Sequence, residues 1–160
     1  MERILFRRSV KKDVPYVNSL FIQMVKTVNA RMLKEGIEPY TDLENGFEEN
    51  YLDRFYVDNN NLIFVAESNG DVIGFLSINN HRENGYIYLD DFCVSEECRG
   101  QGIGCALIQM AFAFAEEQQI NQILTHVESA NKESIEFYKN RGFQLIEAQG
   151  HRLLIRKEVN

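Results

Sequence analysis

The sequence predicts a single α/β domain built around a mixed β-sheet of about seven strands with about four helices. Three observations lead to this prediction: short segments alternate between apolar and polar residues, longer segments repeat apolar residues at helical spacing, and no repeat, low-complexity tract or linker divides residues 1–160. The segments follow one another in the order β-α-α-β-β-β-α-β-α-β-β. A chain of 160 residues is long enough to bury one core.

The N-terminal third contains one expected strand and two expected helices. Residues 2–10 alternate as a strand does. Asp13 then caps a helix with Pro15 in its first turn, and Gly36 and Pro39 end it. The residues at helical spacing on its inner face are Leu20, Met24, Thr27 and Val28. A second, acidic helix is expected to begin at Thr41 or Asp42 and to carry Leu43, Phe47 and Tyr51.

The rest of the chain alternates between strands and helices. Strands are expected at residues 62–66, 72–78 and 86–94, and the turn signal Asn69-Gly70 joins the first two. A glycine-bearing loop then leads to a long helix whose apolar face carries Ile103, Leu107, Met110 and Phe114. The final elements are a strand at residues 122–127, a helix at 131–140 that ends before Gly142, and a hairpin formed by residues 144–146 and 153–156.

The composition is that of an ordinary soluble domain, with 44 % hydrophobic and 26 % charged residues. A net charge of -7 argues against a protein that tracks nucleic-acid phosphates. The chain has no apolar stretch of about 20 residues and no recognisable secretion signal, so neither a membrane nor an export pathway is expected. Cys93, Cys98 and Cys105 are odd in number and lack metal-ligand spacing, which favours reduced thiols in the cytoplasm.

Acidic residues are concentrated between Arg31 and Asn60, where eight carboxylates face three basic side chains. Such a run is typical of a solvated helix face. It is also consistent with a rim that attracts a cationic amine. The sequence leaves both interpretations open.

The most informative segment lies between the strand at residues 86–94 and the long helix, and reads Cys98-Arg99-Gly100-Gln101-Gly102-Ile103-Gly104. Its glycines allow a sharp turn and a close approach of the backbone to a ligand. The first N–H groups of the helix lack internal partners and, with the helix dipole and Arg99, form an anion site. The GxGxG spacing fits neither a dinucleotide-binding GxGxxG turn nor a P-loop. The alternative is that the glycines only form a tight turn.

At these residues the chain resembles the GNAT superfamily of N-acetyltransferases. The family signature R/Q-x-x-G-x-G/A is similar to Arg99-Gly100-Gln101-Gly102-Ile103-Gly104. A second family element, N-x-x-S/A-x-x-F/L-Y-x-x-x-G-F, is similar to residues 131–143. The resemblance covers nearly the whole chain and implies a mostly antiparallel sheet, acetyl-CoA as co-substrate, no metal, and an amine acceptor.

The resemblance also implies a role for individual residues. Main-chain groups of 92–94 would pair with the pantetheine arm like an added strand, and N–H groups of 99–104 would hold the diphosphate. Asn131 would contact the pantetheine, and Tyr138 would lie near the sulfur. The expected coenzyme-binding residues are Phe92, Cys93, Val94, Arg99, Gly100, Gln101, Gly102, Ile103, Gly104 and Asn131. The chain departs from the family at Cys98, where an aromatic or histidine is common, and at Ser95-Glu96, which replace a frequent proline.

Acetyl transfer to an amine requires a base, because an alkyl ammonium has a pKa near 10.4 and is almost fully protonated at neutral pH. Residues 86–91 are similar to the Y-L-E-D stretch of polyamine acetyltransferases, and this resemblance implies that Asp90 is the base, acting directly or through water, with Asp91 as its neighbour. Strand alternation puts the two carboxylates on opposite faces unless a bulge intervenes. The alternative is that one or both aspartates pair with a nearby cation.

Two further groups complete the expected chemistry. The backbone N–H of Cys93 or Val94 is expected to polarise the acetyl carbonyl, and Tyr138 to protonate the thiolate. The alternative for Tyr138 is simple core packing beside Phe137. Cys93 also suggests a ping-pong route through an acetyl-cysteine, although a cysteine on an apolar strand is more often a small core residue. The three histidines show no metal spacing, and His126 is expected to be structural.

The main hypothesis is therefore direct acetyl transfer from acetyl-CoA to a primary amine, with a cationic small molecule as acceptor. A protein N-terminus or lysine is an alternative acceptor, and a longer acyl group an alternative donor. The rival from another class is a module that binds acetyl-CoA without turnover, which would not need Asp90 and Tyr138. The resemblance also implies a homodimer, formed through the exposed side of the mixed sheet or through the C-terminal hairpin, residues 144–157.

Overall fold

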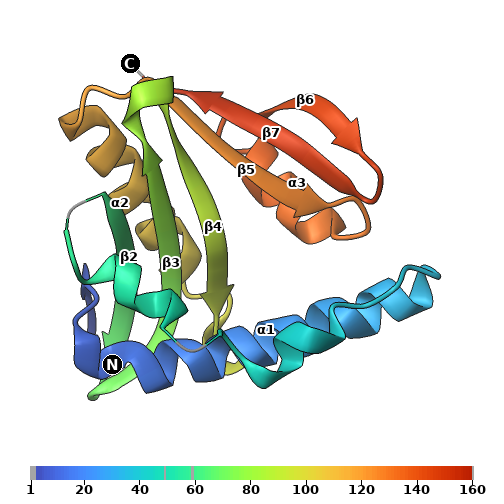
Figure 1. Ribbon diagram of the computed structural model, residues 1–160, viewed down its shortest axis with the longest axis horizontal. Helices are drawn as coiled ribbons and strands as arrows, with labels where there is room; N and C mark the ends of the chain where they lie inside the picture. Colours follow the sequence, from blue (N-terminus) through green and yellow to red (C-terminus); the bar gives the residue numbers. More distant parts are fainter. Residues whose placement is uncertain (1–2, 49, 59, 160) are drawn as a thin grey trace.

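The computed structural model describes residues 3–48, 50–58 and 60–159, and in these ranges seven strands form one sheet in the order β1-β2-β3-β4-β5-β7-β6. Neighbouring strands are antiparallel except for β4 and β5, which are parallel (Figure 1). The strands are β1 (Ile4–Arg8), β2 (Asn61–Ser68), β3 (Asp71–His81), β4 (Tyr86–Val94), β5 (Gln122–Glu128), β6 (Gln144–Gln149) and β7 (Arg152–Glu158). The mixed, mostly antiparallel sheet expected from the sequence is confirmed.

The parallel pair is short, and this splits the sheet. Residues 86–89 of β4 pair with residues 122–125 of β5, and beyond them the two strands part. The rest of β4 pairs with β3 alone, while β5 continues alongside β7. Figure 1 shows β5, β6 and β7 turning away from β1–β4. Within the described part of the chain, the C-terminal end of β4 therefore has one edge that no strand covers.

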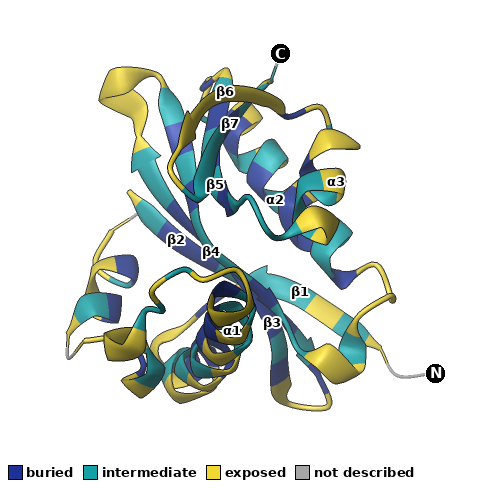
Figure 2. Cartoon of the chain, turned by 90° about the vertical axis from the view of Figure 1, so that its right-hand side faces the viewer, coloured by how far each residue is buried: buried dark blue, intermediate teal, exposed yellow. Residues whose placement is uncertain are grey.

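The helices are divided between the two faces of the sheet. α1 (Val14–Lys34) packs Val17, Leu20 and Phe21 in one cluster with Val65 and Phe75. α2 (Ile103–Glu117) and α3 (Lys132–Lys139) pack on the other face, where the buried residues include Ile103, Leu107, Leu76, Ile87 and Tyr138 (Figure 2). The alternation of each strand supplies both faces with apolar side chains. No helix within the described ranges is long and apolar enough to cross a bilayer.

The start of α1 is fixed to the sheet by a buried carboxylate. Asp13 receives two hydrogen bonds from the guanidinium of Arg7, of 2.8 and 2.9 Å, and a third of 2.8 Å from the backbone N–H of Val10. Arg7 also binds Glu67 on β2 at 2.9 Å. These bonds, with that of Arg7 first, hold the pKa of Asp13 below its usual value. The first strand is shorter than expected, and Glu2 lies outside the described residues.

The acidic segment after α1 differs from the expectation. Two short 3-10 turns, Thr41–Asn45 and Tyr51–Phe55, replace the expected second helix, so the described residues form three α-helices and not four. Gly46 has a φ of 94° and Asn50 a φ of 70°, and these left-handed conformations interrupt any right-handed helix. Phe47 and Tyr51 stack at a centroid distance of 5.2 Å, whereas Leu43 is exposed.

Candidate active site

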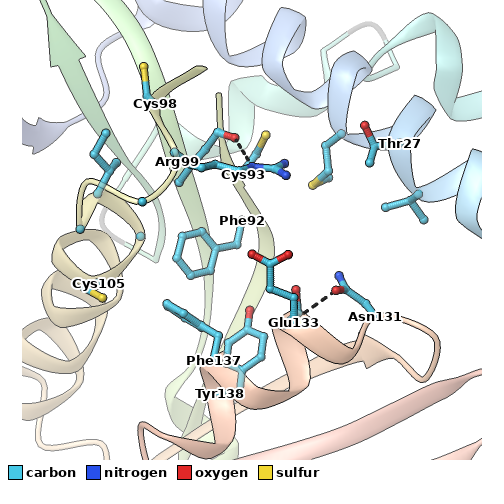
Figure 3. A pocket seen from close by; sticks show the side chains of 18 of the residues that line it. Thr27, Phe92, Cys93, Cys98, Arg99, Cys105, Asn131, Glu133, Phe137 and Tyr138 are labelled. Carbon is cyan, nitrogen blue, oxygen red and sulfur yellow. Dashed lines mark hydrogen bonds between the residues drawn. The ribbon is translucent and has the colours of Figure 1, made fainter. Parts of the chain in front are cut away.

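A cavity of about 400 Å3 lies at the open edge of β4 and is lined from both faces of the sheet (Figure 3). One wall is formed by α1 and the opposite wall by the loop before α2, the first turn of α2, and α3. The expected coenzyme residues that line it are Phe92, Cys93, Val94, Arg99, Gly100, Gly102, Ile103, Gly104 and Asn131, together with Tyr138. Gln101 is exposed and is not among the lining residues. The cavity thus brings together both sequence motifs.

The loop before α2 has the geometry of an anion site. Gly100 and Gly102 have φ values of +80° and +79°, and a Cβ added at either would meet nothing within 4 Å. These glycines are therefore required by backbone conformation and not by crowding. Gly102 is the N-cap of α2 and no side chain caps the helix, so the first N–H groups remain available to a ligand. Arg99 donates from Nε to the Val94 carbonyl at 3.3 Å and extends toward α1 (Figure 3).

The pairing of β4 with β3 determines which main-chain groups of β4 face the gap between β4 and β5, where the two strands part. The N–H of Ser95 donates to the carbonyl of Ile73 at 2.8 Å, and Val94 lies opposite Gly74. Opposed residues in an antiparallel pair alternate between mutually hydrogen-bonded and non-bonded pairs. Val94 is in a non-bonded pair, so its N–H points away from β3, as does that of Phe92, while the N–H of Cys93 points toward β3. Of the two expected oxyanion donors, Val94 is the one that faces the gap.

Tyr138 is held rigidly on α3 with its hydroxyl toward the cavity (Figure 3). Its side chain is 7 % exposed, and its ring packs edge-on against Phe137 and Phe143 at centroid distances of 5.4 and 5.1 Å. Burial raises the pKa of Tyr138, which keeps the phenol protonated at neutral pH. Asn131 fixes the start of α3, because its Oδ1 accepts a hydrogen bond of 3.1 Å from the N–H of Ser134.

Asp90 and Asp91 lie outside the cavity lining, in a β-bulge on β4. Leu76 pairs with Phe92 and Ile78 with Leu89, so both aspartates oppose the single residue Ser77. The Ser77 hydroxyl accepts a hydrogen bond of 2.9 Å from the N–H of Asp91. The bulge removes the alternation that would separate the two carboxylates.

The environment of the two carboxylates sets their charge. Burial first, and the charge of Asp90 second, raise the pKa of Asp91 to about 7. Asp90 accepts a hydrogen bond of 2.8 Å from the hydroxyl of Tyr51, which follows α1 on its side of the sheet. Neither aspartate makes an ion pair with any residue that the structure describes. The alternative in which they pair with a cation therefore finds no support.

Cys93 is unsuited to carry an acetyl group. Its side chain is 6 % exposed, and its thiol donates to the carbonyl of Leu20 on α1 at 3.4 Å. Burial raises the pKa of the Cys93 thiol to about 11. At neutral pH the thiol is protonated and is a poor nucleophile, which argues against the ping-pong route.

The histidines near the gap take part in hydrogen-bond networks. His126 bonds the Tyr88 hydroxyl at 2.6 Å through Nδ1 and Gln149 Oε1 at 2.8 Å through Nε2. His151 lies 3.5 Å from a carboxylate oxygen of Glu128, at the end of β5. Among the described residues no cluster of histidine, cysteine and carboxylate groups could hold a metal ion.

A comparison with models of known families shows to which family the chain belongs. The model of the acetyltransferase (GNAT) family matches residues 29–143. The chain belongs to this family. It is thus an acetyl-CoA-dependent N-acetyltransferase, and the family and enzyme class expected from the sequence are confirmed.

Relatives and solved structures agree with this assignment. The acetyltransferase is 34 % identical over 73 residues to the GCN5-related N-acetyltransferase 6, chloroplastic, of Arabidopsis thaliana, a match that covers 46 % of this chain and 25 % of the relative. It is 29 % identical over 154 residues to an uncharacterised N-acetyltransferase of Methanocaldococcus jannaschii, covering 87 % and 68 %. The crystal structure of PaiA N-acetyltransferase from Thermoplasma acidophilum in complex with coenzyme A superimposes with a TM-score of 0.80 at 18 % identity, over 98 % of this chain and 99 % of that one. The last similarity concerns the fold.

One wall of the acetyltransferase cavity was not expected from the sequence. Met24, Thr27, Val28 and Arg31 of α1 line it, at positions i, i+3, i+4 and i+7 of the helix. The sequence indicated Met24, Thr27 and Val28 as part of a single inner face. α1 instead has two contact faces, because Val17, Leu20, Phe21 and Val25 pack in the core beside this stripe. The helical spacing of these residues was the only signal in the sequence, and it does not distinguish a helix face that packs in the core from one that lines a cavity.

Proposed function

We propose that the acetyltransferase binds acetyl-CoA in the cavity and transfers the acetyl group directly to a primary amine that approaches from the α1 side of the sheet. The observation that carries this proposal is the cavity at the split between β4 and β5. It joins an anion-binding loop and Tyr138 on one face to the side of the sheet that carries Asp90 and Tyr51. Both substrates can therefore be bound at the same time, and residues 1–160 act as one catalytic domain.

The coenzyme takes the positions that the free main-chain groups allow. Its diphosphate is held by the N–H groups of 99–104 at the start of α2, and by the guanidinium of Arg99. Its pantetheine arm lies along 92–94 and is contacted by the amide of Asn131. The N–H groups of Phe92 and Val94 point toward the arm. The N–H of Cys93 points toward β3, so Cys93 only lies between the two residues that bond the arm.

The residues around the thioester have separate roles in the reaction. Asp90 takes the proton of the ammonium, directly or through water, and the amine nitrogen forms a bond to the acetyl carbon. The N–H of Val94 stabilises the oxyanion of the tetrahedral intermediate. The nitrogen of the intermediate gives its second proton to water, the carbon–sulfur bond breaks, and Tyr138 gives its proton to the leaving thiolate. The Tyr138 phenolate then regains a proton from water. The raised pKa of Tyr138 supports this role, because the phenol holds its proton until the thiolate forms.

The acceptor is proposed to be a cationic small molecule. Asp90 and Asp91 lie beside each other on β4, and Glu128 ends β5 across the gap. These carboxylates, more than the acidic segment 35–58, support attraction of an ammonium group, because most carboxylates of that segment are exposed. A protein N-terminus or lysine remains the alternative acceptor.

Release of free thiol from acetyl-CoA in the presence of single amines tests this function. Turnover with amines, abolished by omitting either substrate, supports it. The rival is a module that binds acetyl-CoA without turnover. It is favoured if calorimetry shows coenzyme binding while a broad amine panel gives no thiol release.

A homodimer is proposed through the C-terminal hairpin. β6 is an edge strand whose residues are all exposed, including Leu145 at 60 % and Ile146 at 43 %. An exposed apolar edge strand favours pairing with another strand. Light scattering on Leu145→Lys, compared with the parent chain, tests this assembly.

A further inference from the structure

Arg31 is a cation in the cavity wall, and no described residue bonds one of its guanidinium nitrogens. It lies on the stripe of α1 that lines the cavity, one turn after Thr27. Its Nη1 atom is buried and has no hydrogen-bond partner among the residues that the structure describes. Arg99, the other arginine of the lining, by contrast bonds the Val94 carbonyl. A buried guanidinium nitrogen without a partner is unfavourable unless a ligand supplies an acceptor.

The position of Arg31 indicates which substrate supplies that acceptor. The diphosphate loop, α2 and α3 lie on one face of the sheet, whereas α1 packs on the opposite face. Tyr51 packs with α1 and bonds Asp90, so the expected base serves the α1 side. Figure 3 shows Thr27, on the same stripe, beside the cavity on the α1 side. Arg31 therefore belongs to the wall from which the amine approaches.

We propose, on the basis of the acetyl transfer proposed above, that Arg31 binds a carboxylate of the acceptor, which is an amino acid or a similar molecule with an amine and a carboxylate. The planar guanidinium presents a fork of N–H donors that matches a carboxylate. The amine of the same molecule faces Asp90 and Asp91. The two charges of the acceptor are then each met by opposite charge, which fixes its orientation toward the thioester.

This arrangement selects against amines that lack the carboxylate. An acceptor without it leaves Nη1 of Arg31 buried and unpaired in the complex, and a site that is built to bond a polar group discriminates strongly against its absence. The competing explanation is that Arg31 binds a phosphate or carbonyl oxygen of the coenzyme. The two explanations differ in which substrate loses affinity when Arg31 is replaced.

Matched pairs of amines test the proposal. Lysine and cadaverine, ornithine and putrescine, and arginine and agmatine share an amine skeleton and differ by one carboxylate. We expect kcat/KM to favour the carboxylate member of at least one pair, and Arg31→Gln to lower kcat/KM for that member by roughly 10- to 100-fold while changing its partner by less than about threefold. Arg31→Lys keeps the positive charge but lacks the fork of donors, so its kcat/KM for the carboxylate-bearing amine is expected to lie between those of the parent chain and Arg31→Gln. Lys34→Gln, one turn further along α1 and outside the cavity lining, is the matched control and leaves kcat/KM unchanged.

Calorimetry with coenzyme A separates the explanations and shows that each variant is folded. An unchanged Kd for coenzyme A in Arg31→Gln, with the loss confined to carboxylate-bearing amines, supports the proposal. A weakened Kd for coenzyme A with no change in the amine preference overturns it, and so does equal turnover of both members of every pair. If no amine releases thiol although coenzyme A binds, the proposed function fails. In that case, lysine is titrated into the complex with coenzyme A. Absence of heat then also overturns the proposal that Arg31 binds a carboxylate of the acceptor.

Discussion

The hydroxyl of Tyr51 donates a hydrogen bond of 2.8 Å to Oδ2 of Asp90. Tyr51 belongs to the 3-10 turn after the acidic segment, and Asp90 to the bulge of β4. Burial raises the pKa of Tyr51, so it stays a donor at neutral pH. The bond fixes one carboxylate of the pair and leaves Asp91 as the half-buried neighbour whose protonation responds to pH near neutrality. Several measurable properties depend on this pair.

The pH profile of the enzyme is expected to contain a limb near pH 7, where Asp91 titrates with a pKa of about 7. Its carboxylate form supports proton removal from the ammonium, so kcat/KM rises as pH increases through this limb. In Asp91→Asn the limb is absent. Profiles of both proteins with the same amine check this, and an unaltered limb in Asp91→Asn would contradict the assignment to Asp91.

The unfolding free energy also depends on Asp91, but it falls with increasing pH, whereas kcat/KM rises. A carboxyl group whose folded pKa is raised binds its proton more tightly in the folded state. Its stabilising contribution is complete below the unfolded pKa and is lost as pH rises through the folded value of about 7. Relative to the parent chain, Asp91→Asn is therefore expected to gain about 1–3 kcal/mol of unfolding free energy between about pH 5 and pH 8. Urea unfolding at both pH values measures this, and a difference that is independent of pH would refute it.

Tyr138→Phe tests the acid role. Removal of the hydroxyl is expected to lower kcat by about 10²- to 10⁴-fold, the range typical of a positioned general acid. Coenzyme A affinity should change by less than about threefold, and stability should be kept because the buried ring still packs against Phe137 and Phe143. Thiol release and calorimetry provide the two readouts. Unchanged kcat would assign Tyr138 to packing alone.

The glycine loop offers a comparison within one motif. Gly102→Ala places a Cβ on a residue with φ of +79°, which costs about 1–2 kcal/mol of strain and displaces the N-cap of α2. We expect coenzyme A to bind about tenfold more weakly or worse. Gly104→Ala is the control, because Gly104 has helical conformation and an added Cβ would meet Phe92 at 3.6 Å, an ordinary contact. Equal effects of both variants on the Kd would show that backbone conformation is not what the loop requires.

The sequence predicted the parts of the site that depend on local residue type. Gly100 and Gly102 were recognisable because a left-handed turn before a helix requires glycine. Asn131 and Tyr138 were indicated by the resemblance of residues 131–143 to a family element, and in the structure they lie at the N-cap and near the end of one short helix. The order of strands and helices likewise follows from local periodicity.

The remaining parts depend on pairing between distant segments. The proximity of Asp90 and Asp91 results from a bulge opposite Ser77, and a single strand does not reveal where its partner has one residue fewer. Arg31 was counted with an acidic segment, whereas its place in the cavity depends on how α1 crosses the split sheet. The prediction of an acidic second helix was wrong, because the spacing of apolar residues does not reveal that Gly46 and Asn50 have positive φ angles.

Calorimetric titration of the folded chain with coenzyme A is the most direct test of the central assignment. The cavity at the edge of β4, with its glycine loop and Arg99, predicts binding of one coenzyme A per chain, weakened by Gly102→Ala and retained by Gly104→Ala. Absence of heat from a chain shown to be folded by circular dichroism would contradict the assignment of this cavity to the coenzyme.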